Sequence, residues 1–378
     1  MNVLLLPAWY PELGQISGVF FHERAKALRA LGIRMGVGIC DVNFRQNLPW
    51  GFRYEEDQGI PVFRIRKKNW TPFWEQGVQK QKKKPLEKIY RAYVDRFGEP
   101  DLIHMDSARI AEAVLPLVRK TGLPFTYTEH YSKLLSANRD SYLYRMGQEA
   151  ASKADHCFYI SRFVKNRLNL PEEKSSYLPN SIDFSLFSLA SQRTSVLFHF
   201  KALGSLRAIK GYDRLLRAFS LVHGKYPEAR LTIGGNGPEW DSLHQIQKEL
   251  RLEDAVTFAG AISPEEKQDF YQDADAFLCT SDLETFSVVL IEALASGIPV
   301  ISTKCGGPED FVNKENGLLA ERSISDLARA MEQMIHNRAQ YDASSIREAA
   351  RAKFDQALVA QRQIAVWQSL LRRGEGKH

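Results

Sequence analysis

The chain has no long hydrophobic run among its 378 residues. No apolar stretch approaches the ~18 residues that a membrane-spanning helix needs, so we predict no transmembrane helix. The opening segment Asn2–Pro7 is too short for a signal peptide and has no basic start, and it is typical of a first buried strand. Low-complexity segments and short-period repeats are also absent. With 44% hydrophobic and 25% charged residues, the composition predicts a soluble globular protein.

Cysteine is scarce as well. The four cysteines, Cys40, Cys157, Cys279 and Cys305, are scattered and form neither a CxxC pair nor a metal-binding spacing. Each lies near an apolar run, as reduced cysteines of a protein core do. This pattern predicts free thiols and favours a cytoplasmic location.

What the sequence does contain is a regular alternation of strand and helix signals. At this length two domains are expected. Short apolar runs predict buried strands at residues 3–6, 35–40, 62–65, 101–104, 125–128 and 156–160, and again at 196–203, 229–233, 256–258, 276–279 and 299–302. Helical segments separate most of them, which predicts an α/β fold with parallel sheets covered by helices on both faces.

The change of domain is expected in the segment that begins Leu178-Pro-Asn-Ser-Ile-Asp183 and runs through Arg193. We predict an N-terminal domain of residues 1–185 and a C-terminal domain of residues 186–355. Residues 356–378, which include Trp367, are expected to form a helical tail.

Two carboxylates in the C-terminal half stand eight positions apart. Glu284 follows the strand expected at 276–279, and Glu292 lies inside the apolar segment 288–295, which predicts a buried helix. A buried carboxylate is unfavourable unless something donates a hydrogen bond to it, and sugar or ribose hydroxyls are suitable donors. The start of that helix, at Thr285–Ser287, offers free N–H groups that can hold a phosphate. The combination suits a sugar nucleotide. The alternative is that Glu292 pairs with a core lysine or arginine and Glu284 is a solvated loop residue.

Cations and glycines precede this pair. In the segment Leu203–Gly211, Arg207 and Lys210 stand before a helix, where two cations can neutralise a diphosphate or can simply be solvated. The Gly-rich loop Ile233–Pro238 lacks a full dinucleotide fingerprint. Asp273 and Asp275 form an Asp-x-Asp pair that precedes the strand at 276–279, so they are expected at the N-terminal edge of the sheet. We assign this pair a structural role and expect no catalytic metal.

Two histidines of the N-terminal half end predicted strands. His104 and His130 are therefore expected at one sheet edge, where α/β folds bind ligands, although a strand-end histidine can equally be structural. Glu129, beside His130, is a candidate for orienting its loop. Gly18 stands before a helix start and allows a ligand to approach the backbone closely.

Several motifs in order resemble retaining glycosyltransferase family 4: Glu284-x7-Glu292, Ser296–Ile301 and Gly306–Glu309. The resemblance runs from residue 2 to about residue 355, and the start, Trp9-Tyr-Pro11 with Ser17–Phe20, looks like enzymes of bacterial surface polysaccharide assembly. It implies the GT-B fold, in which two Rossmann-like domains face a cleft and a C-terminal helix crosses back to the N-terminal domain. The family often has Gly where this chain has Ser287, and we expect binding to survive the change.

The resemblance also implies roles for single residues. The N-terminal domain would bind the acceptor, and the C-terminal domain the nucleotide sugar. Glu284 and His130 would hold the donor sugar, Arg207 and Lys210 the diphosphate, and Glu292 the ribose. These roles make His130, Glu284, Arg207 and Lys210 the catalytic set. The donor-binding set is Gly18, Gly235, Ala261, Ile262, Thr285, Phe286, Ser287, Val288 and Glu292.

An enzyme of this kind (EC 2.4) moves a sugar from a nucleotide-diphosphate sugar, here expected to be a UDP-sugar, to a hydroxyl acceptor. The acceptor attacks from the face that the leaving diphosphate occupies, and no cofactor, metal or protein nucleophile is needed. The expected setting is polysaccharide or glycolipid assembly. Two alternatives stay open, a sugar-nucleotide 2-epimerase of the same fold and a non-catalytic regulator that binds nucleotide sugars.

The positive charge of the chain is concentrated in one segment. Between Arg64 and Arg91, ten lysines and arginines stand against two glutamates, a local net charge of +8, whereas the whole chain carries +6. Trp70, Phe73 and Trp74 lie among these cations. The segment is either a solvated loop or a contact with an anionic membrane surface, where a lipid-linked acceptor would be found. Nucleic acid binding lacks any supporting module, so we predict none.

Overall fold

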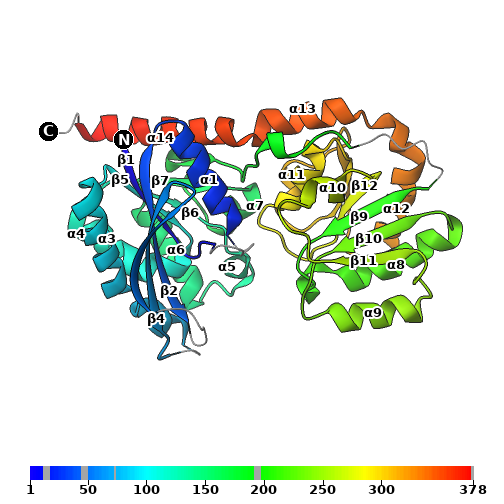
Figure 1. The fold of residues 1–378 in the computed structure, drawn as a ribbon, viewed down its shortest axis with the longest axis horizontal. Coiled ribbons are helices and arrows are strands. Elements are labelled where there is room, and N and C mark those ends of the chain that lie inside the picture. The colour runs from blue at the N-terminus through cyan, green and yellow to red at the C-terminus, as the bar shows by residue number, and fades with distance from the viewer. Residues whose placement is uncertain (12–17, 44–49, 72–73, 191–196, 376–378) are drawn as a thin grey trace. The chain divides into compact units, whose positions relative to one another are not determined.

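The computed structural model of the protein describes residues 1–11, 18–43, 50–71, 74–190 and 197–375 (Figure 1). It separates into two compact units, which we call unit 1 (Met1–Asn180 with Gln356–His378) and unit 2 (Ser181–Asp355). Unit 2 thus begins at Ser181, whereas the boundary predicted from the sequence lay after residue 185. The last residues, from Gln356 onward, return to unit 1.

Unit 1 is built on an eight-stranded sheet with the strand order β3-β4-β2-β1-β5-β6-β7-β8. All neighbouring strands run parallel except β3 and β4, which form an antiparallel hairpin. The strands are β1 (Asn2–Pro7), β2 (Arg34–Asn43), β3 (Gly51–Asp57), β4 (Ile60–Lys68), β5 (Leu102–Asp106), β6 (Phe125–Thr128), β7 (His156–Tyr159) and β8 (Ser175–Tyr177).

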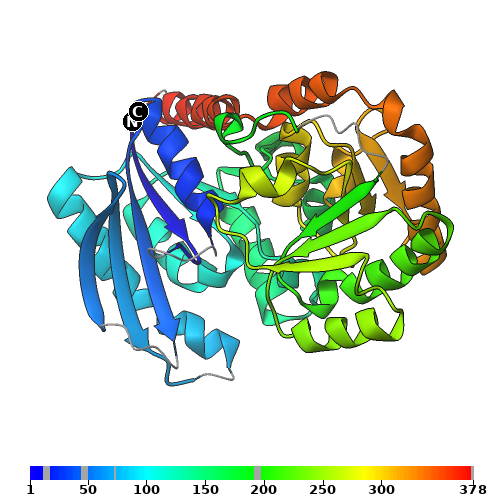
Figure 2. The same ribbon diagram turned by 45° about the vertical axis from the view of Figure 1, so that its right-hand side comes forward.

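Helices cover both faces of this sheet, as Figures 1 and 2 show. Helix α3 packs on β2 closely, because a Cβ at Gly36 or Gly38 would come within 2.8 Å of Tyr93 or 2.7 Å of Ile89. Helix α14 packs on α1. The helices of unit 1 are α1 (Val19–Ala30), α2 (Glu75–Lys80), α3 (Lys83–Phe97), η1 (Ala108–Ile110), α4 (Ala111–Thr121), α5 (Ser132–Ser136), α6 (Tyr142–Lys153), α7 (Arg162–Arg167), η2 (Glu172–Lys174) and α14 (Gln356–Glu375).

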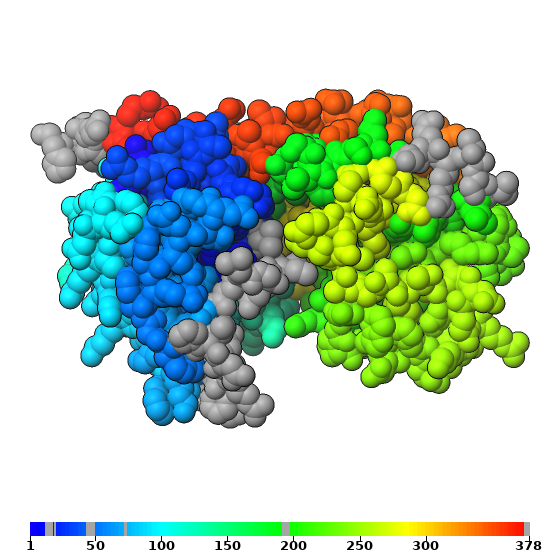
Figure 3. Space-filling view, in the orientation of Figure 1, coloured from blue at the N-terminus to red at the C-terminus, as the bar shows by residue number. Residues whose placement is uncertain are grey.

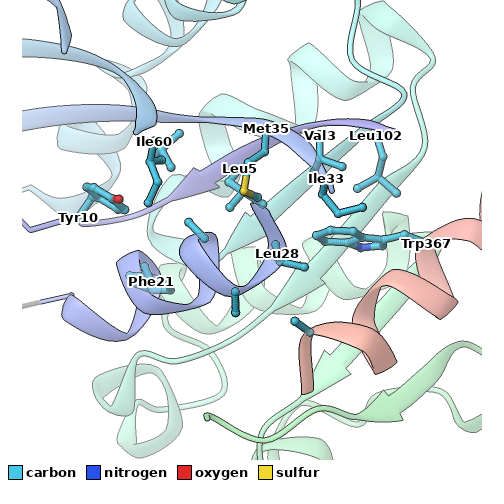
Figure 4. Close-up of a cluster of buried hydrophobic side chains, with 14 of the residues drawn as sticks. Val3, Leu5, Tyr10, Phe21, Leu28, Ile33, Met35, Ile60, Leu102 and Trp367 are labelled. Carbon is cyan, nitrogen blue, oxygen red and sulfur yellow. The ribbon is translucent and has the colours of Figure 1, made fainter. Parts of the chain in front are cut away.

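One core of unit 1 joins the start of the chain to its end. Figure 4 shows the indole of Trp367, from α14, beside Val3, Leu28, Ile33 and Leu102. Trp367 is fully buried, and its Nε1–H donates to Thr126 Oγ1 at 3.1 Å. Burial of such a large side chain stabilises the fold by several kcal/mol, about 3–5 by the usual cost of truncating it. The tail therefore belongs structurally to the N-terminal unit, as the resemblance implied.

Unit 2 has a six-stranded, wholly parallel sheet with the order β11-β10-β9-β12-β13-β14. Helix α8 packs on α9 and α12, whereas α11 packs on α13. The strands are β9 (His199–Leu203), β10 (Arg230–Gly234), β11 (Val256–Gly260), β12 (Ala276–Cys279), β13 (Val300–Thr303) and β14 (Gly317–Ala320). The helices are η3 (Phe184–Leu186), η4 (Ala208–Lys210), α8 (Tyr212–Lys225), α9 (Trp240–Glu249), α10 (Lys267–Tyr271), α11 (Val288–Ala295), η5 (Pro308–Asp310), α12 (Ile324–Asn337), η6 (Arg338–Gln340) and α13 (Ala343–Phe354).

The predicted α/β class and the parallel sheets are confirmed, and each predicted strand has its counterpart within a few residues. The start of the strand expected at 196–203 and the end of the boundary segment at Arg193 lie outside the described residues. The pattern missed β3, β8 and β14. The helical tail expected at residues 356–378 is helix α14 (Gln356–Glu375), with residues 376–378 outside the described ranges. The four cysteines are free and buried, as predicted. No helix in the described ranges is long and apolar enough to cross a membrane.

Candidate functional site

Glu284 and Lys210 meet at the carboxyl ends of two neighbouring strands of unit 2. Lys210 follows β9, Glu284 follows β12, and these strands pair directly. Lys210 Nζ lies 2.6 Å from Glu284 Oε1, and the hydroxyl of Ser281 donates to the same oxygen at 2.7 Å. The side chain of Glu284 is 13% exposed, so this residue is not the solvated loop residue of the alternative.

The Lys210–Glu284 pair lines a small cavity together with Cys279 and Thr280. Burial disfavours the charge on Lys210, but the nearby carboxylate of Glu284 outweighs it and raises the pKa of the amine. The neighbouring thiol of Cys305 lowers the pKa of Cys279 to about 7. The cavity therefore presents a fixed cation, which suits a phosphate oxygen, beside a fixed carboxylate, which suits hydroxyl groups.

The turn that carries the cations is held by glycine. Gly211 has φ 65°, and a Cβ there would lie 2.3 Å from the carbonyl oxygen of Thr280. Lys210 is thereby fixed at the cavity, since its own carbonyl also accepts from Thr280 Oγ1 at 2.9 Å. Arg207, in contrast, is exposed and makes no side-chain hydrogen bond or ion pair to the described part of the chain. Its guanidinium is thus available to a ligand, whereas Lys210 is already positioned.

The loop Thr285–Ser287 leads directly into α11. Its last residue, Ser287, is the N-cap and has φ 84° and ψ 84°, a left-handed conformation that side chains rarely adopt. This explains why glycine suits the position, and it makes Ser287 a strained residue. Phe286 is fully buried, and Gly307 packs so tightly on it that a Cβ would lie 2.4 Å from its Cα. The backbone N–H groups at the start of α11, at Val288, are therefore held in place on a rigid loop.

Glu292 is buried in α11 with donors from the protein itself. Lys267 pairs with one of its carboxylate oxygens, and the hydroxyl of Tyr271 donates to the other at 2.9 Å. The residue is only 4% exposed. Hence Glu292 does pair with a lysine, as the first half of the alternative had it, although Lys267 is partly exposed and does not lie in the core. Burial alone no longer argues for a ribose hydroxyl at Glu292, and that role stays a prediction.

The glycine-rich loop after β10 is a packing device. A Cβ at Gly235 would lie 1.8 Å from the carbonyl oxygen of Gly204, so the loop can approach β9 only without a side chain. Ala261 and Ile262 follow β11; Ala261 is exposed and Ile262 is half-buried. A Cβ at Gly234 would come within 2.9 Å of Ile262, so the two loops touch. The donor-binding role of these residues remains a prediction.

In unit 1, His130 stands in an aromatic and acidic setting. Its ring is 5.1 Å from that of Phe20 and 5.2 Å from that of Phe21, and its side chain is 4% exposed. Both ring nitrogens are buried and make no hydrogen bond to the described residues, although Nε2 lies within ion-pair distance of Asp106. The carboxylate of Glu129 accepts from the backbone N–H groups of His130 and Tyr131 at 2.8 and 2.7 Å. Glu129 therefore does orient the histidine loop, as expected.

His104 belongs to a buried network at the same sheet edge. Asp106 Oδ1 lies 3.1 Å from His104 Nε2, 3.4 Å from His130 Nε2 and 2.9 Å from Arg24 Nη1. Burial opposes the charge on Asp106, but His104 and Arg24 outweigh it and hold the pKa of this carboxyl well below its usual value. The two histidines do converge, and His104 is the structural one, since it is fully buried and hydrogen-bonded.

Gly18 is fixed by its backbone. It has φ 91°, and a Cβ there would lie 3.0 Å from the Trp9 ring. Both features require glycine at this position whether or not a ligand binds. They therefore do not test the predicted ligand contact. Ser17, beside it, lies outside the described residues.

The Asp-x-Asp pair has partners that fit a structural role. Asp273 pairs with Lys201 and His199, and Asp275 accepts from the backbone N–H of His199 at 2.8 Å. Within the described ranges no group of three His, Cys, Asp or Glu side chains could hold a metal ion.

Several residues of these sites were not predicted from the sequence. Asp106 could have been predicted, because it lies at the end of the same strand as His104. Arg24, Lys267 and Tyr271 lie inside helices and carry no local signal of their roles. Only the folded contacts connect Lys267 and Tyr271 to Glu292.

Two family models match the chain. Residues 17–186 match the family described as Glycosyltransferase Family 4, and residues 198–353 match Glycosyl transferases group 1. These two matches together span most of the chain; the first lies mainly in unit 1 and the second lies in unit 2. The chain therefore belongs to the glycosyltransferases that combine these two domains.

The curated relatives include glycosyltransferases and a sugar-phosphate synthase. The chain is 25% identical over 61% of its length to a subunit of the phosphatidylinositol N-acetylglucosaminyltransferase of Arabidopsis thaliana, of which the match covers 53%. It is 27% identical over 67% of its length to an uncharacterized glycosyltransferase of Haemophilus influenzae, of which 71% is covered. A 41% identity to the mannosylfructose-phosphate synthase of Agrobacterium fabrum covers 28% of this chain and 25% of that protein. The chain thus spans about half the length of the first of these relatives.

Solved structures show the same fold. The sucrose-phosphate synthase of Thermosynechococcus elongatus superposes with a TM-score of 0.80 at 18% identity, over 98% of this chain and 99% of that one. Anabaena HepE in complex with UDP and glucose gives a TM-score of 0.75 at 21% identity, over 98% and 100%. The fold is that of the GT-B glycosyltransferases, as the motifs implied.

Proposed function

We propose that this protein is a retaining glycosyltransferase that moves a sugar from a UDP-sugar to a hydroxyl acceptor. The observation that carries the proposal is the Lys210–Glu284 pair, fixed at 2.6 Å in a cavity at the carboxyl edge of the unit 2 sheet. This edge is where α/β folds bind nucleotides. The choice of UDP is supported by HepE, whose solved structures hold UDP and UDP-glucose.

In this proposal Lys210 and Arg207 bind the diphosphate, and the N–H groups at the start of α11 add hydrogen bonds. Glu284 binds sugar hydroxyls, Glu292 the ribose, and His130 the sugar from unit 1. The acceptor hydroxyl attacks the anomeric carbon from the face that the diphosphate leaves, and a diphosphate oxygen takes its proton. The protein contributes positioning and stabilisation of the departing charge.

The test is product analysis with a panel of radiolabelled sugar nucleotides. Release of UDP together with a labelled glycoside of retained anomeric configuration is the expected result. A labelled, still nucleotide-bound 2-epimer would instead identify an epimerase of this fold. Tight nucleotide-sugar binding without any turnover would identify a regulator.

We further propose that the acceptor is lipid-linked and that the enzyme works on the inner face of an anionic membrane, in polysaccharide or glycolipid assembly. The support comes from the exposed part of the basic segment. Trp70 and Trp74 are 69% and 53% exposed, and Lys68 and Lys80 lie over their rings. They follow the β3–β4 hairpin, which lies on the surface of unit 1 (Figure 3, blue). Aromatic rings at headgroup depth with cations around them suit such a surface.

The basic segment is not one exposed patch, however. Arg64, Arg66 and Lys82 are buried, and Lys83 pairs with Glu112 at 2.7 Å. The membrane test must therefore change only exposed lysines.

A triple variant with Lys68, Lys80 and Lys84 changed to Glu should lose cosedimentation with anionic vesicles, while wild type binds them at low salt and is released at high salt. Vesicles of neutral lipid are the control. If the wild type binds neither kind of vesicle, the membrane proposal is wrong and a soluble acceptor is the remaining interpretation. We expect no binding of nucleic acid.

A further inference from the structure

A second cavity lies in unit 1, at the carboxyl ends of β2 and β4. It measures about 300 Å³, which is at the lower end of the range for ligand pockets. Polar and charged side chains dominate its lining, with two valines beside them. The polar lining residues are Asn69, Glu75, Gln79, Lys82 and Arg109.

Lys82 is buried at this cavity without an acidic partner. It is 6% exposed, and its amine donates only a long hydrogen bond of 3.4 Å, to the carbonyl oxygen of Arg109. No carboxylate in the described part of the chain comes within ion-pairing distance of it. Burial lowers the pKa of Lys82 to about 8, which still leaves the amine mostly charged at neutral pH. A buried, unpaired cation is unfavourable in the empty protein and favourable once an anion binds beside it.

Two further donors face the same cavity. Gln79 is 2% exposed, and neither its side-chain nitrogen nor its oxygen has a partner in the described residues. The guanidinium of Arg109 stacks over the ring of Tyr131 at 4.8 Å and makes no ion pair within those residues. A lysine, an arginine and an amide with free N–H groups form a set of donors that suits the oxygens of a phosphoryl group.

The cavity is also next to the histidine loop. Tyr131, under the Arg109 guanidinium, is the residue after His130. A group bound at Lys82 would therefore lie beside the part of unit 1 that holds the proposed catalytic histidine. Glu75, the one carboxylate of the lining, is exposed at the start of α2 and can accept hydroxyl groups of the same ligand.

We propose that this pocket binds the phosphoryl group of a phosphorylated acceptor through Lys82, Arg109 and Gln79. The inference rests on the proposed transferase function and adds the chemical class of its acceptor. The phosphoryl group belongs either to a soluble phosphorylated compound or to a lipid, and the pocket chemistry is the same for both.

The direct test is NMR of the protein with its lysines labelled with ¹³C at Cε, titrated with inorganic phosphate at constant ionic strength. The Lys82 signal, assigned from its loss in Lys82→Met, should shift and saturate in the millimolar range, while the exposed Lys120 on α4 stays unchanged. In Lys82→Met prepared with labelled arginine side chains, phosphate binding followed on the Arg109 signal should weaken about tenfold or more. Lys120→Met is the matched control and should bind as wild type does.

A second titration distinguishes the sources of the phosphoryl group. Glycerol phosphate, but not glycerol, should shift Lys82 if the ligand is soluble. Vesicles that contain phosphatidic acid should bind in a Lys82-dependent manner if it is a lipid. No shift of Lys82 with any phosphate probe, or an equal shift of Lys120, would overturn the proposal.

UDP binding, measured on the same samples, keeps this result separate from the transferase proposal. A wild-type protein that binds UDP but not phosphate would contradict the pocket proposal and leave the transferase proposal standing. A protein whose Lys82 responds to phosphate but that does not bind UDP would contradict the transferase proposal and leave the phosphate pocket standing.

Discussion

Replacing Lys82 by methionine should make the protein more stable, although it removes a charged side chain from a polar pocket. In the folded state, burial lowers the pKa of Lys82 from 10.5 to about 8. Each pKa unit corresponds to about 1.4 kcal/mol, so keeping the amine charged costs the folded state about 3 kcal/mol. Methionine fills a similar volume without a charge. We therefore expect Lys82→Met to raise the free energy of unfolding at pH 7 by up to about 3 kcal/mol.

The pH dependence gives this prediction a sharper form. Between pH 8 and 10.5 the unfolded chain keeps its proton on Lys82 while the folded protein has released it. The unfolded state then binds more protons, so the free energy of unfolding of the wild type rises with pH through this window. Methionine does not titrate. The advantage of the variant is therefore full below pH 8 and disappears by pH 10.5. The charged and titratable groups around Lys82 are Cys40, Asp41, Glu75 and Arg109.

The assay is urea unfolding followed by circular dichroism at pH 7 and at several values between 8 and 10.5. Pulsed hydrogen exchange would assign the transition to unit 1. The control Lys120→Met should stay within about 0.5 kcal/mol of wild type at every pH, as exposed substitutions usually do. A Lys82→Met protein that is less stable than wild type at pH 7 would refute the reasoning, because it would show that the amine has a stabilising partner.

The other predictions concern unit 2. Glu284→Gln should lower kcat more than donor affinity, because Glu284 acts on the reacting sugar; an equal loss of UDP affinity, measured by calorimetry, would contradict this. Glu292→Gln should weaken UDP binding and also lower the free energy of unfolding by about 2 kcal/mol, since it leaves Lys267 without its partner; urea unfolding checks the second effect. Ser287→Gly should raise that free energy by up to about 1 kcal/mol by relieving the positive φ, whereas a loss would mean that the serine hydroxyl matters more. Transfer activity should persist in EDTA, because Lys210 supplies a fixed cation, and a strict need for Mg²⁺ or Mn²⁺ would argue against this phosphate site.

The sequence was sufficient where a function depends on strand ends. The strand runs before Glu284 and Lys210 placed both residues at the carboxyl edge of one parallel sheet, and the folded pair lies there. The same reasoning brought His104 and His130 together. In a parallel α/β unit, the alternation of strands and helices along the sequence predicts at which edge of the sheet each loop lies. It does not predict the distances between side chains at that edge.

The sequence was insufficient to predict interaction partners that come from distant helices. Nothing in the segment around Lys267 marks it as the partner of Glu292, because an exposed lysine and a buried one have the same sequence signal. The basic run of residues 64–91 shows the same limit. Only the fold separates the buried Arg64 and Lys82 from the exposed Lys68. The edge strand β3 was missed because its side chains are mostly polar, and most of them are exposed to water.

Backbone strain gives an independent reason to place function at the carboxyl edges of the two sheets. Five residues other than glycine have a positive φ in the described part of the chain. Gln58 turns the β3–β4 hairpin, and Asn169 and Arg251 directly follow helix C-caps, so ordinary chain reversal accounts for these three.

Ser107 and Ser287 have no such explanation. Ser107, with φ 113°, follows Asp106 at the end of β5, and Ser287, with φ 84°, starts the helix beside Glu284. Strain of this kind costs about 1–3 kcal/mol per residue and persists where the surrounding structure enforces it. Both serines stand beside the acidic residue that organises its site, Asp106 in unit 1 and Glu284 in unit 2. Glycine would relieve the strain at both positions, so two strained serines at these edges fit a pre-shaped binding edge in each unit.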